Sequence, residues 1–164
     1  MFGVNDVYDY ESDLRNPRKI QEGLEGGILQ PVFHRDVLAA AWFSTFLIIT
    51  ISFLSRQPQN IAANAAIVLL GWQYSSSPLR LKEVPVLDSL SNGLIVFIGW
   101  FAGFSFSGGS ILEAPAKGYM LSLCTTGIHA LGAIADVEAD IAAGQRTIAV
   151  ALGKRPAAVM AALC

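Results

Sequence analysis

The chain has 164 residues, a length that fits one ordinary domain. Hydrophobic residues make up 53% of it and charged residues only 15%, well below the roughly 25% typical of soluble domains, and the mean hydropathy is +0.49. The net charge of −2 offers no basic face, which excludes nucleic acid as a partner. The composition therefore predicts an integral membrane protein built as an all-α, multi-pass transmembrane helical bundle.

The N-terminal segment NDVYDYESD, residues 5–13, concentrates acidic side chains in an otherwise apolar chain. It begins with acids rather than a basic region and an apolar run, so we expect no signal peptide. Helical spacing places one amide and three carboxylates within an arc of about 100°: Asn5, Asp6, Asp9 and Asp13. Glu11 points away from that arc. Carboxylates that converge without a basic partner repel one another and need a cation, and hard oxygen ligands suit Mg²⁺.

Apolar runs follow in chain order, and a membrane-spanning helix needs about 20 residues. The runs lie at 37–54, 61–72, 93–112 and 118–135, and a fifth begins near Ile148. The first, third and fourth are long enough to span a bilayer, whereas the second is short unless its polar flanks join it. Because the runs lack an amphipathic period, a soluble helical core is the less favoured alternative.

Three long polar segments alternate with pairs of these runs, at 5–36, 75–92 and 136–147. Two crossings separate each from the next, so all three are expected on one side of the membrane. The short turns at 55–60 and 113–117 fall on the other side. The long segments carry most of the basic residues, namely Arg15, Arg18, Lys19, Arg35, Arg80, Lys82 and Arg146. The positive-inside tendency then predicts that the long segments are cytoplasmic.

The third polar segment, DVEADIAAG, repeats the geometry of the first. Asp136 and Asp140 share a helical face with Gly144, while Glu138 lies off it. Two carboxylate faces on one side of a bundle suggest a clamp that holds one diphosphate through metal ions. In the middle segment, YSSSPLRLK, Arg80 and Lys82 become candidate diphosphate partners.

The remaining chemistry-bearing residues give no further site. His129 lies within an apolar run, and we interpret it as a hydrogen-bonded core residue. Cys124 and Cys164 have no metal-type spacing and are expected to be free thiols.

At these motifs the chain resembles the UbiA superfamily of intramembrane prenyltransferases. The first signature of the family is NDxxDxxxD followed by Arg, and the chain resembles it at Asn5, Asp6, Asp9, Asp13 and Arg18. The second, DxxxDxxxG with a basic residue and Thr after it, resembles Asp136, Asp140, Gly144, Arg146 and Thr147. Between them, Tyr74, Arg80 and Lys82 look like the family's tyrosine-to-lysine loop. The run NDVYDYESDLRNPRK looks most like the branch that contains lycopene elongases.

The resemblance implies Mg²⁺-dependent transfer of a prenyl group from a prenyl diphosphate to a lipophilic acceptor within the membrane. It implies metal ligands at Asn5, Asp6, Asp9, Asp13, Asp136 and Asp140. It implies diphosphate contacts from Arg18, Tyr74, Arg80, Lys82 and Arg146, with Asp9, Asp140 and Lys82 as the catalytic residues.

Against the family's roughly nine helices, residues 1–164 look like one prenyltransferase domain shortened at both ends. Two other functions stay open. One is a non-catalytic membrane fragment. The other is a cation-coupled transporter, which is disfavoured because the acidic residues lie at helix ends rather than mid-span.

Overall fold

The computed structural model describes residues 2–20 and 28–164, without the side chains of Phe2 and Arg18. The described residues form helices and connecting turns, which confirms the predicted all-α bundle. In chain order the elements are α1 Phe2–Tyr8, α2 Tyr10–Asp13, α3 Pro17–Ile20, η1 Pro31–Phe33, α4 His34–Ser55, α5 Pro58–Ser75, η2 Leu81–Glu83, α6 Leu87–Phe106, η3 Ile111–Glu113, α7 Ala116–Ala143, α8 Ile148–Leu152 and α9 Lys154–Leu163.

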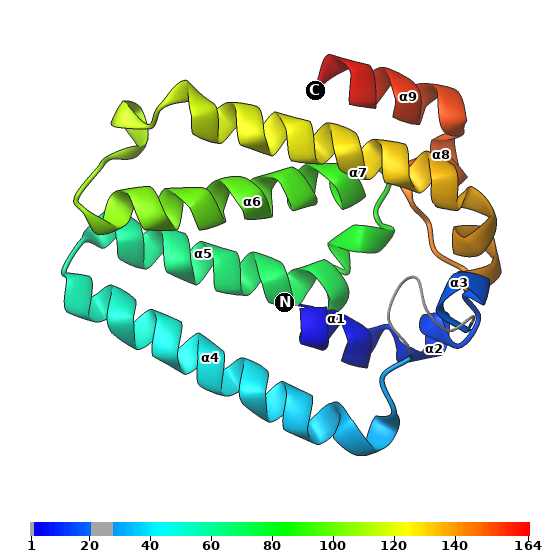
Figure 1. Cartoon of the computed structure of the whole chain (residues 1–164), viewed down its shortest axis with the longest axis horizontal. Coiled ribbons are helices and arrows are strands. Elements are labelled where there is room, and N and C mark those ends of the chain that lie inside the picture. The colour runs from blue at the N-terminus through cyan, green and yellow to red at the C-terminus, as the bar shows by residue number, and fades with distance from the viewer. Residues whose placement is uncertain (1, 21–27) are drawn as a thin grey trace.

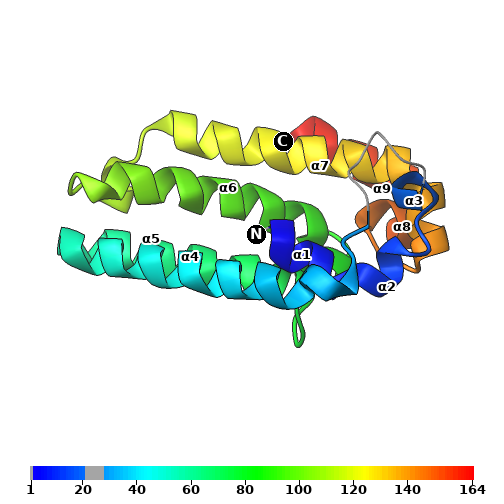
Figure 2. The same ribbon diagram turned by 60° about the horizontal axis from the view of Figure 1, so that its bottom comes forward.

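The long helices α4 to α7 run side by side and alternate in direction (Figure 1). The α4–α5 and α6–α7 turns lie at one end of this bundle. At the other end gather α2, α3, η2, α8 and the last turns of α7, and Figure 2 shows the same grouping from a second side. The expected placement of short turns opposite long polar segments is therefore the arrangement that the chain adopts.

Among the described residues, three segments are long and apolar enough to cross a membrane: Pro31–Ser55, Leu87–Phe106 and Ala116–Ala143. They contain the first and fourth predicted runs and most of the third. The helix α4 exposes a row of large apolar side chains, with Trp42, Phe43 and Phe46 each more than half exposed. Lipid chains are a suitable environment for such a surface, whereas water is not.

Two predicted boundaries were wrong. The third run was expected to continue to Leu112, but α6 ends at Phe106, and the chain turns at Gly108, whose φ of +92° suits glycine. The fourth run was expected to end at Ala135, whereas α7 continues to Ala143. The extension places both aspartates of the second acidic segment, Asp136 and Asp140, on the same helix as the apolar run. The fifth run is split into α8 and α9 at Gly153, whose φ is +96°.

The α6–α7 contact is close enough to require glycine. A Cβ added at Gly93 would stand 1.9 Å from Thr126 Oγ1 and 2.6 Å from the carbonyl oxygen of Ser122. The Ser122 hydroxyl in turn donates to the Gly93 carbonyl at 2.8 Å. Small residues that let helix backbones approach in this way are the usual basis of helix packing in lipid.

We therefore expect Gly93→Ala to lower the free energy of unfolding by about 2 kcal/mol, the usual scale of overpacking. Thermal unfolding in detergent measures this. Gly103→Ala on the same helix is the matched control, because a Cβ there meets nothing within 4 Å. Equal melting temperatures for the two variants would contradict the assigned α6–α7 contact.

Candidate active site

The first acidic segment lies at the end of the bundle where the long polar segments gather. Its helix kinks at Asp9, between α1 and α2, while the Asp13 N–H still donates to the Asp9 carbonyl at 2.8 Å. Asp9 and Asp13 are buried, with 2% and 3% exposure. Asn5 is half-buried, and its side-chain oxygen accepts a hydrogen bond from the Ser75 hydroxyl on α5. The helical arc therefore faces inward, toward α5 and α7.

The second acidic segment faces the first from the last two turns of α7. Asp140 is 8% exposed and accepts a hydrogen bond from the Thr147 hydroxyl at 3.0 Å, while Asp136 is half-buried. α7 then ends at Gly144, whose φ of +74° forms the C-cap. Glu11 and Glu138 are both exposed, as helical spacing predicts.

One cavity of about 460 Å³ joins the two segments; we call it the acidic cavity. Seven of the predicted site residues line it: Asn5, Asp9, Asp13, Tyr74, Lys82, Asp136 and Asp140. The other four predicted residues are placed differently. Asp6 does not line the cavity, and its side chain is 42% exposed, 4.0 Å from Lys19 Nζ. Arg146 is exposed. Arg80 does not line the cavity, but its guanidinium lies 3.8 Å from Asp9 Oδ1. The side chain of Arg18 is outside the described residues.

Two ammonium groups stand among the carboxylates of the acidic cavity. Lys82, 7% exposed, forms an ion pair with Asp9 Oδ1, and Lys19 Nζ lies 2.7 Å from Asp13 Oδ2. Arg80 adds a longer contact of 3.8 Å to Asp9 Oδ1 while it pairs with Glu83. Burial raises the pKa of the Asp9 carboxyl, and the charge of Lys82 opposes that rise. Asp9 Oδ1 therefore depends on a nearby cation for its charge.

The donor set of the acidic cavity fits Mg²⁺. Its wall carries amide and carboxylate oxygens and, among its lining residues, no cysteine. Within the described residues, no three His, Cys, Asp or Glu side chains stand close enough to enclose an ion by themselves. Mg²⁺ keeps several waters and commonly shares its coordination with substrate phosphates, so one or two carboxylates from each side suffice for it.

Several residues of the cavity wall were not predicted as site residues: Asn16, Lys19, Asn92, His129, Gln145 and Thr147. A signal for one of them was present, because His129 lies seven residues before Asp136 and so shares its helical face. His129 is hydrogen-bonded, as expected of a core residue, but it also reaches the cavity. Cys124 and Cys164 are free thiols, as predicted.

Comparison with known proteins places this chain in one family. The model of the UbiA prenyltransferase family matches residues 1–164. The C(50) β-cyclic carotenoids biosynthesis protein LbtBC of Dietzia is 37% identical over 172 aligned positions, covering 100% of this chain and 38% of that protein. The lycopene elongase/hydratase of Corynebacterium glutamicum is 34% identical, covering 96% of this chain and 54% of that protein.

Solved structures agree on the fold. A UbiA homologue from Archaeoglobus fulgidus bound to GPP and Mg²⁺ superposes with a TM-score of 0.78 at 20% identity, covering 99% of this chain and 56% of that one. The same comparison with a structure bound to DMAPP and Mg²⁺ gives a TM-score of 0.74 at 21% identity, covering 95% and 54%. The chain thus spans between 38% and 56% of the length of these proteins. It belongs to the UbiA prenyltransferase family, whose members are prenyltransferases.

Proposed function

We propose that the intact protein containing this chain transfers a prenyl group from a prenyl diphosphate to a lipophilic acceptor within the membrane, with Mg²⁺ as the cofactor. The observation that carries the proposal is the acidic cavity itself, where two carboxylate segments more than a hundred residues apart face each other around the buried Lys82 and the half-buried Lys19. The structural neighbours from Archaeoglobus fulgidus, which are bound to DMAPP or GPP and to Mg²⁺, support it.

The side chains that line the cavity have separable roles in this proposal. Asn5, Asp9 and Asp13 would hold Mg²⁺ from one side, and Asp136 and Asp140 from the other. When bound, Mg²⁺ supplies positive charge that neutralises the diphosphate and stabilises it as a leaving group. Lys82 and Lys19 would donate hydrogen bonds to diphosphate oxygens, with Arg18, Arg80 and Arg146 adding positive charge around them.

An apolar groove gives the prenyl chain a place beside this polar site. A cavity of about 220 Å³ lies among α1, α4 and α5 and is lined by Val4, Ala41, Ile48 and Ile67 among others. Gly71 lines both this groove and the acidic cavity. A diphosphate in the acidic cavity could therefore extend an isoprenoid tail past Gly71 into an environment that excludes water from a cationic allylic carbon.

For the acceptor we propose a carotenoid polyene of the lycopene type. Relatives that are named lycopene elongase/hydratase match at 32–36% identity, whereas a digeranylgeranylglyceryl phosphate synthase of Methanobrevibacter smithii matches at 26%. Membranes containing the intact protein, labelled prenyl diphosphate and lycopene should yield a lengthened carotenoid with Mg²⁺ and none with EDTA. Label transfer only to a glycerol lipid would replace the acceptor, and no transfer at all would favour a non-catalytic membrane protein.

We further propose that the acidic cavity opens on the cytoplasmic side, which the excess of basic residues on that side supports. Single cysteines introduced at the exposed positions Ser77 and Ala142 should react with an impermeant thiol reagent from the cytoplasmic side. A cysteine at Leu112, which is 95% exposed, should react from the opposite side. Cys124 and Cys164 are replaced by alanine in all three. Labelling of Ser77→Cys and Leu112→Cys from one side would contradict the orientation.

A further inference from the structure

A chain of hydrogen-bonded side chains forms the inner wall of the acidic cavity and joins three helices. Tyr74 on α5, Asn92 on α6 and His129 on α7 all line the cavity. The Tyr74 hydroxyl lies 2.9 Å from Asn92 Nδ2 and 3.3 Å from His129 Nε2. The other ring nitrogen, His129 Nδ1, lies 3.2 Å from the hydroxyl of Ser89, which is fully buried.

The directions of these hydrogen bonds follow from what each group can donate. The Asn92 amide nitrogen can only donate, so the Tyr74 oxygen accepts from it. The Tyr74 hydroxyl then has its own proton to donate to His129 Nε2, and we assign the ring the tautomer that accepts it. A ring that accepts at Nε2 is neutral and carries its proton at Nδ1, from which it donates to Ser89. His129 is therefore held with an available lone pair directed at the Tyr74 hydroxyl.

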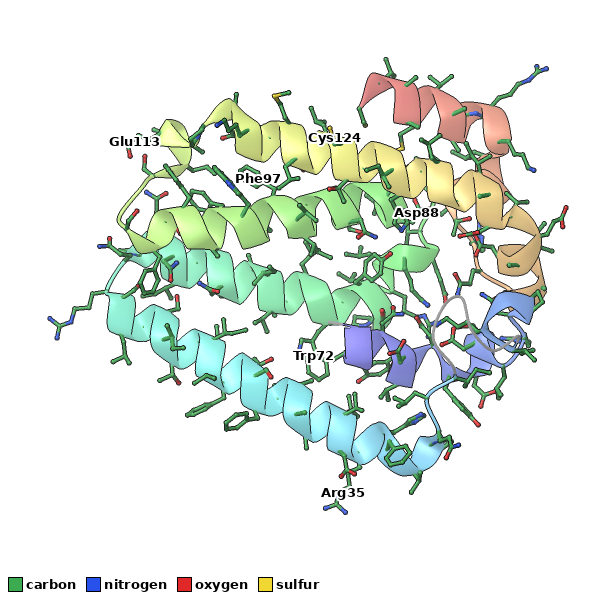
Figure 3. All side chains as sticks on the ribbon, in the orientation of Figure 1. Arg35, Trp72, Asp88, Phe97, Glu113 and Cys124 are labelled. Carbon is green, nitrogen blue, oxygen red and sulfur yellow. The ribbon has the colours of Figure 1, made fainter. Side chains whose placement is uncertain are left out.

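A buried carboxylate lies next to Ser89 in the chain. Asp88, labelled in Figure 3 at the start of α6, is fully buried. Its Oδ2 accepts a hydrogen bond from the Ile148 N–H at 2.8 Å, whereas Oδ1 has no hydrogen-bond partner among the described residues. Asp88 immediately precedes Ser89, whose hydroxyl is the partner of His129 Nδ1. A positive charge on the imidazole would thus have a desolvated carboxylate one residue from its hydrogen-bond partner.

Prenylation of an alkene, the proposed reaction, has a proton to dispose of. The bond between the prenyl carbon and the diphosphate oxygen breaks, and its electron pair leaves with the diphosphate. The acceptor's double bond supplies the two electrons of the new carbon–carbon bond and becomes a carbocation. In a site that excludes water, that cation is quenched by losing one proton from a neighbouring carbon, which restores a double bond, and a polyene has no basic group of its own to take that proton.

We propose that Tyr74, His129 and Asp88 form the relay that removes this proton. The Tyr74 oxygen takes the proton from the acceptor while its own proton moves to His129 Nε2, and Asp88 stabilises the resulting imidazolium. The position suits this role, since His129 precedes Asp136 by seven residues and so lies about 10 Å closer to the start of α7, away from the carboxylate end. The proposal rests on the proposed function and gives it a proton acceptor.

The test uses the intact protein and follows diphosphate release and coupled product separately. His129→Gln keeps an oxygen that can accept from Tyr74 but removes the base. We expect prenyl diphosphate binding to be retained and coupled product to form about 100-fold more slowly, the lower end of general-base contributions. With an acceptor deuterated at the carbon that loses its proton, a primary isotope effect should appear in this variant. His34→Gln, at the start of α4 and outside the cavity wall, should match the parent in both readouts.

Tyr74→Phe keeps the ring and removes only the relay hydroxyl, so it should show the same isotope effect and the same loss of coupling. A structural role for the network would instead lower the melting temperature without producing an isotope effect. If both variants form coupled product at the parental rate, the relay is wrong while the proposed function stands. If the parent itself releases no diphosphate from any prenyl diphosphate, the proposed function fails and the relay fails with it.

Discussion

Replacing Asp9 or Asp140 by asparagine in the intact protein is expected to lower Mg²⁺-dependent prenyl transfer by at least about 100-fold, the loss typical for one strong electrostatic contact at a reacting centre. Each change keeps side-chain size and removes one negative charge from the wall of the acidic cavity. The two residues act from opposite sides, since Asp9 is at the α1–α2 kink and Asp140 in the last turn of α7. Initial rates at several Mg²⁺ concentrations measure the effect.

The chain provides matched controls for these two substitutions. Glu11 lies two residues after Asp9 and Glu138 two residues before Asp140, yet both are exposed and neither lines the cavity. Glu11→Gln and Glu138→Gln remove the same charge from the same segments and should retain most activity. Aspartate variants as active as these glutamate variants would reduce both acidic segments to solvated helix ends.

Lys82→Met is expected to have the second-largest effect, because it acts on stability and on binding together. Lys82 and Asp9 are 7% and 2% exposed and form an ion pair. Removal of one partner from a buried pair leaves the other charge desolvated, which destabilises proteins by roughly 3 kcal/mol or more. The lost ammonium should also weaken prenyl diphosphate binding by at least about tenfold, or roughly 1.4 kcal/mol.

Thermal unfolding and equilibrium binding separate these two consequences. Lys117→Met, at the exposed start of α7 beyond the opposite end of the bundle, should change neither. The double variant Asp9→Asn with Lys82→Met should be less destabilised than the sum of the single variants, since no unpaired charge remains buried. Additive losses in the double variant would show that Lys82 and Asp9 do not interact, contrary to the structure.

The sequence was sufficient to predict the fold class, because the lengths of the apolar runs and the positions of the polar segments follow from the thickness of the bilayer. Sequence periodicity also placed Asn5, Asp9 and Asp13 on an inward arc, and the structure brings them to the same cavity as Asp136 and Asp140. Periodicity could not separate Asp6 from that arc, although Asp6 lies at the edge of the arc and its carboxylate is directed toward Lys19 rather than into the cavity. Local spacing carries no information on which part of an arc the neighbouring helices cover.

Contacts between segments that are distant in the chain also could not be predicted from the sequence. Asn92 and His129 each look like an isolated polar residue in or beside an apolar run, and only the packing of α5, α6 and α7 joins them to Tyr74. Asp88 likewise reads as an ordinary acidic residue in the first turn of α6. Its bond to the Ile148 N–H spans sixty residues of chain and depends on how α8 folds back. Tertiary hydrogen bonds of this kind have no signature in a single sequence.

The central claim is that the acidic cavity holds a prenyl diphosphate through divalent metal ions. Equilibrium binding of a non-hydrolysable prenyl diphosphate analogue to the purified intact protein, with Mg²⁺ and with EDTA, tests it most directly. We expect removal of Mg²⁺ to weaken binding by at least about 100-fold, or roughly 2.7 kcal/mol, and Asp140→Asn to weaken Mg²⁺-dependent binding while Glu138→Gln does not. Equal affinity of the parent protein with Mg²⁺ and with EDTA would contradict it.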